Sequence, residues 1–112
     1  MAFAEKTVEW ATEELELTLE EVGQALGVNR RTIGRWRERL SEPSPEHRKN
    51  LERISQLRYF LSTSFRDPEA AQAWMQTPLA ALQGRTPHFA ICEGDLDRVV
   101  RLLGTLASGA HI

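Results

Sequence analysis

The sequence predicts an all-α protein, in which an N-terminal helix-turn-helix is joined by a long helix to a small helical C-terminal domain. Three observations lead to this fold class. Helix-capping patterns recur along the 112 residues, apolar residues recur at steps of three and four, and no alternating run with a two-residue glycine turn indicates a strand. We expect the first unit to span residues 1–66 and the second to span residues 67–112.

Six longer helices are expected over residues 4–15, 19–26, 30–40, 45–65, 68–76 and 95–107, with one or two short helical pieces between residues 79 and 92. Thr18 can cap the second helix, and Glu21 completes a capping box with it. Asn29 can cap the third helix. The runs Ser44-Pro45-Glu46 and Asp67-Pro68-Glu69 each provide a cap, a proline in the first turn and an acid at the positive end of the helix dipole.

The long helix over residues 45–65 has one apolar face. Its apolar residues recur at steps of three and four, which predicts that this face is buried: Leu51, Ile54, Leu57, Leu61 and Phe65. Tyr59 and Phe60 lie off the stripe. We expect these two aromatic residues to make a second contact, across a subunit or between the two segments of the chain.

Composition places the chain among ordinary globular proteins, because 41% of its residues are apolar and 27% are charged. No apolar run approaches the ~20 residues that span a membrane. No basic stretch precedes an apolar one, as it would in a secretory signal. A cytoplasmic protein without a membrane partner is therefore expected.

Cysteine and histidine show no catalytic or metal-binding spacing. Cys92 is the only cysteine, so it cannot form an intrachain disulfide, and we interpret it as a small buried apolar residue. His47, His88 and His111 are far apart in the sequence. No catalytic residue, metal site or cofactor is predicted, and we do not expect an enzyme.

Charge is distributed unevenly along the chain. The total is −2, but residues 1–27 carry a net charge of −6, residues 28–66 a net charge of +6 and residues 67–112 a net charge of −2. The middle segment holds ten basic and four acidic residues. A basic block in an otherwise acidic chain indicates a face that binds a polyanion.

The segment from residue 19 to residue 36 has the pattern of a helix-turn-helix, in which two short helices cross steeply through a tight turn. Gly27 stands where the turn needs a left-handed backbone, and Gly23 is small where the helices approach most closely. The apolar residues that would close the angle between the helices are Val22, Leu26, Val28, Ile33 and Trp36.

The outward residues of the expected third helix have the chemistry of a DNA-reading surface. In the major groove, arginine can donate two hydrogen bonds to guanine, and glycine allows close approach. The residues expected to meet operator DNA are Arg30, Arg31, Thr32, Gly34 and Arg35, with Gln24, Arg37 and Arg39 expected to contact phosphates. Because one such unit reads only a half-site, a homodimer is expected. The alternative is a solvated basic helix face.

A second set of motifs lies in the C-terminal segment. The pair Trp74-Met75 is followed by Thr-Pro-Leu-Ala-Ala-Leu-Gln-Gly-Arg-Thr-Pro over residues 77–87, and the last helix ends in Leu-Leu-Gly-Thr-Leu-Ala-Ser-Gly over residues 102–109. This arrangement resembles the toxin-binding domain of the MbcA/ParS/Xre antitoxin family. The preceding helix-turn-helix and the total length resemble its Xre-type members. The segment from His88 to Cys92 departs from the commoner Leu-Glu-x-Leu pattern.

The resemblance implies a type II antitoxin that blocks the active site of a RES-domain toxin, which consumes NAD⁺, and that represses the operon encoding the pair. The toxin-binding residues that it implies are Trp74, Gly84, Arg85 and a tail that would enter the toxin's pocket, Gly109, Ala110, His111 and Ile112. The alternatives are that Trp74 packs in the core or between the domains, and that the tail is a frayed terminus without a partner. The expected partners are the toxin, operator DNA and a second copy of the chain, in a homodimer or a larger hetero-oligomer with the toxin. The alternative is a stand-alone helix-turn-helix transcriptional regulator whose C-terminal domain dimerises or senses a ligand.

Overall fold

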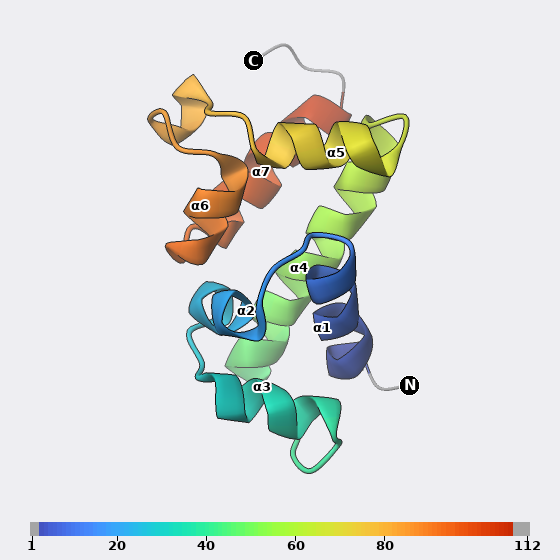
Figure 1. Ribbon diagram of the computed structural model, residues 1–112, viewed down its shortest axis with the longest axis vertical. Helices are drawn as coiled ribbons and strands as arrows, with labels where there is room; N and C mark the ends of the chain where they lie inside the picture. Colours follow the sequence, from blue (N-terminus) through green and yellow to red (C-terminus); the bar gives the residue numbers. More distant parts are fainter. Residues whose placement is uncertain (1–2, 109–112) are drawn as a thin grey trace.

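Helices account for all of the regular structure in the part of the chain that is described. The computed structural model describes residues 3–108, which form seven α-helices and one 3₁₀ helix (Figure 1). In chain order these are α1 (Phe3–Glu13), α2 (Leu19–Leu26), α3 (Arg30–Arg37), α4 (Pro45–Ser64), α5 (Pro68–Met75), η1 (Ala80–Leu82), α6 (Pro87–Cys92) and α7 (Leu96–Ala107). The prediction of an all-α fold is confirmed. None of these helices has the length and apolarity of a bilayer-spanning segment.

Short polar side chains fix most of the helix starts. The predicted caps of α2 to α5 are confirmed, because a side-chain oxygen of each accepts a hydrogen bond from the backbone N–H three residues on: Thr18, Asn29, Ser44 and Asp67. Glu21 completes the predicted capping box at α2. Each cap satisfies an N–H group that the first helical turn leaves unpaired. These starts are therefore encoded locally.

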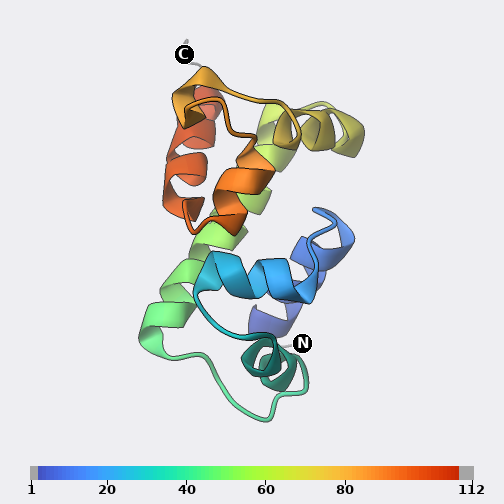
Figure 2. The ribbon, with the colours of Figure 1, turned by 60° about the vertical axis from the view of Figure 1, so that its left-hand side comes forward.

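Helix α4 is the axis on which the other helices assemble (Figures 1 and 2). Both α1 and α7 pack against it, and its predicted stripe is buried at Leu51, Ile54, Leu57 and Leu61. Off this stripe, Phe60 lies against Gly104 of α7, where a β-carbon would come within 3.3 Å of the ring. Phe60 thus makes its expected second contact between the two segments, whereas Tyr59 is exposed.

The two halves of the molecule lie at opposite ends of α4. Helices α1 to α3 surround one end, and α5 to α7 with η1 surround the other (Figures 1 and 2). The molecule is elongated, with principal extents of 43, 25 and 24 Å. The halves meet where α2 packs against α6, and a single set of packed apolar residues runs through both.

Several predicted boundaries differ from the structure by one to three residues. The first helix ends at Glu13 rather than residue 15, and Glu16 adopts a left-handed backbone (φ 58°) just beyond it. The third helix ends at Arg37 rather than Leu40, because Arg39 is also left-handed (φ 59°). The ends of α4 and α5 and the start of α7 each differ by one residue.

The interpretation of Cys92 as a buried apolar residue is confirmed only in part, because the residue packs against the core but is not fully buried. The residue is only half-buried, and its thiol donates a hydrogen bond to the carboxylate of Glu21. The side chain therefore lies at the edge of the core, where its sulfur meets a polar group of the neighbouring helix.

Candidate functional site

The turn between α2 and α3 is closed by glycine backbone. Gly27 ends α2 in the left-handed conformation that the sequence predicts (φ 73°, ψ 28°), which costs a residue with a β-carbon roughly 1–2 kcal/mol. The N–H of Val28 donates to the carbonyl oxygen of Gly23 (2.9 Å). Beyond the turn, Ile33 and Trp36 are 0% and 2% exposed. Helix α3 therefore turns one face into the core and the other toward solvent.

The outward face of α3 carries a group of exposed arginines. Arg30, Arg31, Arg35 and Arg37 are all exposed, and none of them forms an ion pair with an acid in residues 3–108. Gly34 lies among them, and a β-carbon there would meet nothing within 4 Å. We call these five residues the basic face of α3. Their positive charge is not neutralised within the described chain, and it is thus available to an external anion.

The other predicted DNA contacts lie in different settings. The hydroxyl of Thr32 donates to the Asn29 side chain (2.9 Å) and so supports the helix cap. Gln24 is exposed on α2. Arg39 reaches back to α1 and pairs with Glu5 (3.1 Å). Arg39 therefore serves the packing of the N-terminal half, and its predicted phosphate contact would have to compete with that pair.

Trp74 and Gly84 lie in the half of the molecule that is far from α3. Trp74 is half-buried, with its ring centroid 5.8 Å from that of Phe65. Gly84 is exposed in the turn after η1 (φ 84°), and its N–H donates to the carbonyl of Leu79 (2.9 Å). Both residues keep part of their surface open to solvent, as a contact residue must.

Arg85 is held tightly within its own half. Its Nε donates to the carbonyl of Leu82 (2.9 Å), and its guanidinium pairs with Glu93 (3.1 Å) and Asp95 (2.8 Å). The hydrogen bond from Arg85 lowers the pKa of the Asp95 carboxyl. Arg85 thus joins the two ends of α6, a structural role that sequence reasoning missed. The predicted toxin-contacting tail, residues 109–112, lies outside the described residues.

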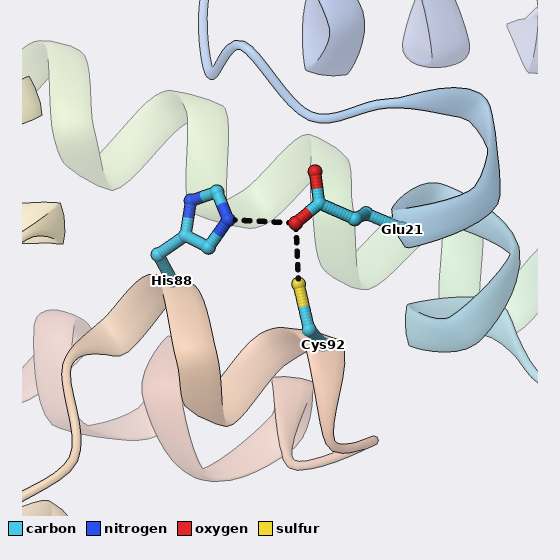
Figure 3. Close-up of side chains that lie close together, drawn as sticks. All are labelled: Glu21, His88 and Cys92. Atoms are coloured by element: carbon cyan, nitrogen blue, oxygen red, sulfur yellow. Dashed lines mark hydrogen bonds and ion pairs between the residues drawn. The ribbon is translucent and has the colours of Figure 1, made fainter.

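Three further polar side chains converge where the two halves meet (Figure 3). Oε2 of Glu21, on α2, lies 3.0 Å from Nε2 of His88 and 3.5 Å from Sγ of Cys92, both on α6. Hydrogen bonds from the Thr18 backbone and then from His88 lower the pKa of Glu21. Partial burial, followed by the charge of Glu21, raises the pKa of the Cys92 thiol to about 12. At neutral pH Glu21 is therefore an ionised carboxylate, and the Cys92 side chain that faces it is a neutral thiol.

Sequence reasoning missed this cluster, although half of its signal is local. His88 and Cys92 are four residues apart, a spacing that places two side chains on the same side of a helix. Glu21 comes from a helix 67 residues earlier in the chain than His88. No local pattern indicates that contact, because it depends on how the two halves pack.

The fold and these surfaces define an elongated all-α protein with a basic helix at one end and a second helical domain at the other. Comparison with known proteins gives that domain its class: residues 61–109 match the antitoxin Xre/MbcA/ParS C-terminal toxin-binding domain.

Relatives that match almost the whole chain give the family. The mycobacterial cidal antitoxin MbcA of Mycobacterium bovis and of Mycobacterium tuberculosis is 31% identical over 108 residues, which cover 95% of this chain and 93% of the relative. A chain in the crystal structure of the M. tuberculosis MbcT–MbcA toxin–antitoxin complex superposes with a TM-score of 0.61 at 29% identity, covering 100% of both chains. The chain therefore belongs to the Xre/MbcA/ParS antitoxin family, as the sequence motifs indicate.

Proposed function

We propose that this antitoxin neutralises a RES-domain, NAD⁺-consuming toxin by direct binding, and that it represses its own operon by binding operator DNA. In this proposal the toxin is bound by residues 67–112 and occluded by the tail at residues 109–112, while DNA is bound by the basic face of α3. The protein acts without catalysis of its own.

Family membership supports the toxin-binding half of the proposal. The domain at residues 61–109 is of the toxin-binding class, and the structural relative was solved as a toxin–antitoxin complex. Trp74 and Gly84 are partly open to solvent in that domain. A partly exposed tryptophan is the residue type most often found at the energetic centre of a protein interface.

The basic face of α3 supports the DNA-binding half, and this observation carries the proposal. Four exposed arginines lie in one eight-residue helix after a tight turn, with no acid in residues 3–108 paired to them. A solvated helix face of ordinary composition would mix both charges, as the exposed side of α4 does with the pair Arg48–Glu52. A twofold dimer would present two such helices to successive half-sites.

Removal of residues 109–112 tests the occlusion of the toxin. The full chain and the truncated chain are each expressed with the product of the neighbouring gene, which the proposal takes to be the toxin, and NAD⁺ content, cell growth and co-purification are measured. We expect the truncated chain to lose inhibition while some binding persists through Trp74 and its surroundings. Full inhibition without the tail would contradict the occlusion. No binding by either form would contradict toxin recognition altogether.

The double substitution Arg31→Ala and Arg35→Ala tests operator binding. Each arginine that reads a base contributes about 1–3 kcal/mol, so we expect the affinity to fall by at least about tenfold and the salt dependence to become shallower. The matched control is Arg66→Ala with Arg98→Ala, which removes the same charge from exposed positions outside α3. If both double substitutions lowered operator affinity equally, or if the first had no effect on it, the basic face of α3 would not be the DNA-binding surface.

A further inference from the structure

We propose that Glu21, His88 and Cys92 form a binding site for a zinc ion at the junction of the two halves of the molecule. The three side chains offer one ligand atom each, and these atoms all lie within 4.8 Å of one another. They converge from two helices, α2 and α6, on a single point between them (Figure 3). All three are partly open to solvent, so an ion can reach them and a water molecule can complete its coordination.

Two of the three distances between ligand atoms are near those around a tetrahedral ion. Zinc binds cysteine sulfur at about 2.3 Å and histidine nitrogen or carboxylate oxygen at about 2.0–2.2 Å, so tetrahedral geometry places the ligand atoms roughly 3.3–3.7 Å apart. Oε2 of Glu21 is already 3.0 Å from Nε2 of His88 and 3.5 Å from Sγ of Cys92. Side-chain movements that bring all three ligand atoms, which already lie within 4.8 Å of one another, to this spacing would admit the ion.

A neighbouring group already orients Glu21, and another can orient His88. Oε1 of Glu21 accepts the N–H of Thr18 in the capping box (2.9 Å), which leaves Oε2 directed at α6. Nδ1 of His88 lies 3.3 Å from the side-chain amide of Gln76. Nε2 of His88 donates to Glu21 in the absence of the ion, so binding moves the imidazole proton from Nε2 to Nδ1. With the amide of Gln76 turned so that its oxygen faces the ring, Nδ1–H then donates to Gln76 and the lone pair of Nε2 faces the ion. Such an outer hydrogen bond accompanies most metal-binding histidines.

The chemistry of the three ligands selects the kind of ion. A thiol sulfur and an imidazole nitrogen bind zinc and similar borderline cations, whereas magnesium and calcium prefer oxygen ligands alone. The thiol proton of Cys92 passes to solvent when the thiolate binds the ion. The charges of the thiolate and the Glu21 carboxylate then balance the two positive charges of the ion, which leaves the half-buried site neutral.

An ion at this place would link the two ends of the molecule. Helix α2 carries the turn that positions the basic face of α3, and α6 lies within the segment matched by the toxin-binding domain. Without the ion, α2 and α6 are joined here by hydrogen bonds to a single carboxylate oxygen. The link would hold the DNA-binding surface in one orientation relative to the toxin-binding one. This consequence rests on the proposed function, but the binding of the ion does not.

Cobalt titration of the full-length, reduced and metal-free protein tests the site. Co²⁺ replaces Zn²⁺ at such sites, and a thiolate ligand gives it an intense charge-transfer absorption. Because Cys92 is the only cysteine, this absorption identifies the ligand without any substitution. We expect saturation at one Co²⁺ per chain, displacement by Zn²⁺, and a rise of roughly 10 °C in the midpoint of thermal unfolding at a hundredfold excess of Zn²⁺ over its Kd.

Substitutions then identify the other two ligands. Glu21→Gln and His88→Gln should each weaken zinc binding by at least about tenfold, and Cys92→Ser should abolish the charge-transfer absorption. His47→Gln is the control, since His47 is also half-exposed but lies on α4. Absence of the absorption in the wild type, saturation at half an ion per chain, or weakening by His47→Gln but not by His88→Gln would each overturn the proposal. If the wild-type protein binds one ion per chain but binds neither operator nor toxin, the metal site stands and the proposed function is contradicted.

Discussion

Gly23 lies so close to Val28 that a β-carbon on the glycine would sit 2.5 Å from the valine carbonyl oxygen. The two backbones are also hydrogen-bonded, since the N–H of Val28 donates to the carbonyl of Gly23 (2.9 Å). The angle between α2 and α3 therefore depends on a position that has no side chain. That angle fixes the direction of the basic face of α3.

We expect Gly23→Ala to destabilise the protein. A contact of 2.5 Å with a backbone oxygen can be relieved only by moving the helix or the turn, and such overpacking costs about 1–3 kcal/mol. Alanine favours a helix interior by only about 1 kcal/mol over glycine. The net free energy of unfolding in urea should therefore fall. Equal or higher stability would show that the turn adapts without cost.

Gly34→Ala is the matched substitution on α3, and it should separate stability from DNA binding. A β-carbon at Gly34 would meet no atom within 4 Å, so stability should stay constant or rise by up to about 1 kcal/mol. Operator affinity should nevertheless fall if the helix backbone lies against the groove, as we propose. The measurement is urea unfolding beside a DNA titration at fixed salt. Unchanged affinity would place Gly34 away from the DNA.

Much of this fold is predictable because its signals are local. Four helix starts are marked by capping residues that lie three positions before the N–H groups they satisfy: Thr18, Asn29, Ser44 and Asp67. The left-handed turn after α2 is indicated by Gly27. Helix ends are less well predicted. The residues just beyond α1 and α3 adopt a left-handed backbone, but they are Glu16 and Arg39 and not glycines, so the sequence does not mark them.

The long-range polar contacts are not predictable in this way. The pair Arg39–Glu5 and the contact Glu21–His88 each join residues more than thirty positions apart. The sequence shows only that such residues are charged or polar, which is typical of a solvated surface. Packing of the two halves decides which of them meet, and it also places Cys92 at the edge of the core beside Glu21.

The continuous core predicts that both halves unfold together. Leu57 is 1% exposed in the middle of α4, so Leu57→Ala should cost about 2–5 kcal/mol. Tyr59→Ala, two residues on, is the control, because Tyr59 is 64% exposed and its loss should change stability by about 0.5 kcal/mol or less. Far-UV circular dichroism and tryptophan fluorescence should report one coincident transition in both variants. Two separated transitions would show that the halves are independent.

The ion pair between Arg85 and Asp95 predicts a stability difference that depends on pH. Asp95 has a pKa below its ordinary value of 3.8, because Arg85 donates a hydrogen bond to it. A carboxyl with a lowered pKa stabilises the folded state above that value, and its contribution is lost as the pH falls through the folded-state pKa. Arg85→Gln should thus lower the thermal midpoint at neutral pH, and the difference from wild type should shrink below pH 3.8.

A control for this prediction lies on α7. Arg101 pairs with Asp97 one helical turn away and its side chain is 72% exposed, so Arg101→Gln should have little effect at any pH. If the thermal midpoint of Arg85→Gln were lower than that of the wild type by the same amount at neutral and acidic pH, the ion pair with Asp95 would not be the cause. The guanidinium would then stabilise the η1 turn chiefly through its hydrogen bond to the Leu82 carbonyl.

The placement of the two surfaces predicts that one chain can bind DNA and toxin at the same time. The basic face of α3 lies at one end of a molecule 43 Å long, and Trp74 and Gly84 belong to the half at the other end (Figures 1 and 2). Neither proposed partner would need to displace the other by direct overlap. Addition of purified toxin to the antitoxin–operator complex should therefore give a slower band in a gel-shift assay, which contains all three components. Release of free operator on toxin addition would contradict this, and it would mean that toxin binding changes the proposed dimer or the angle of α3. The Trp74→Ala variant is the control, because it should retain the operator shift and lose the slower band.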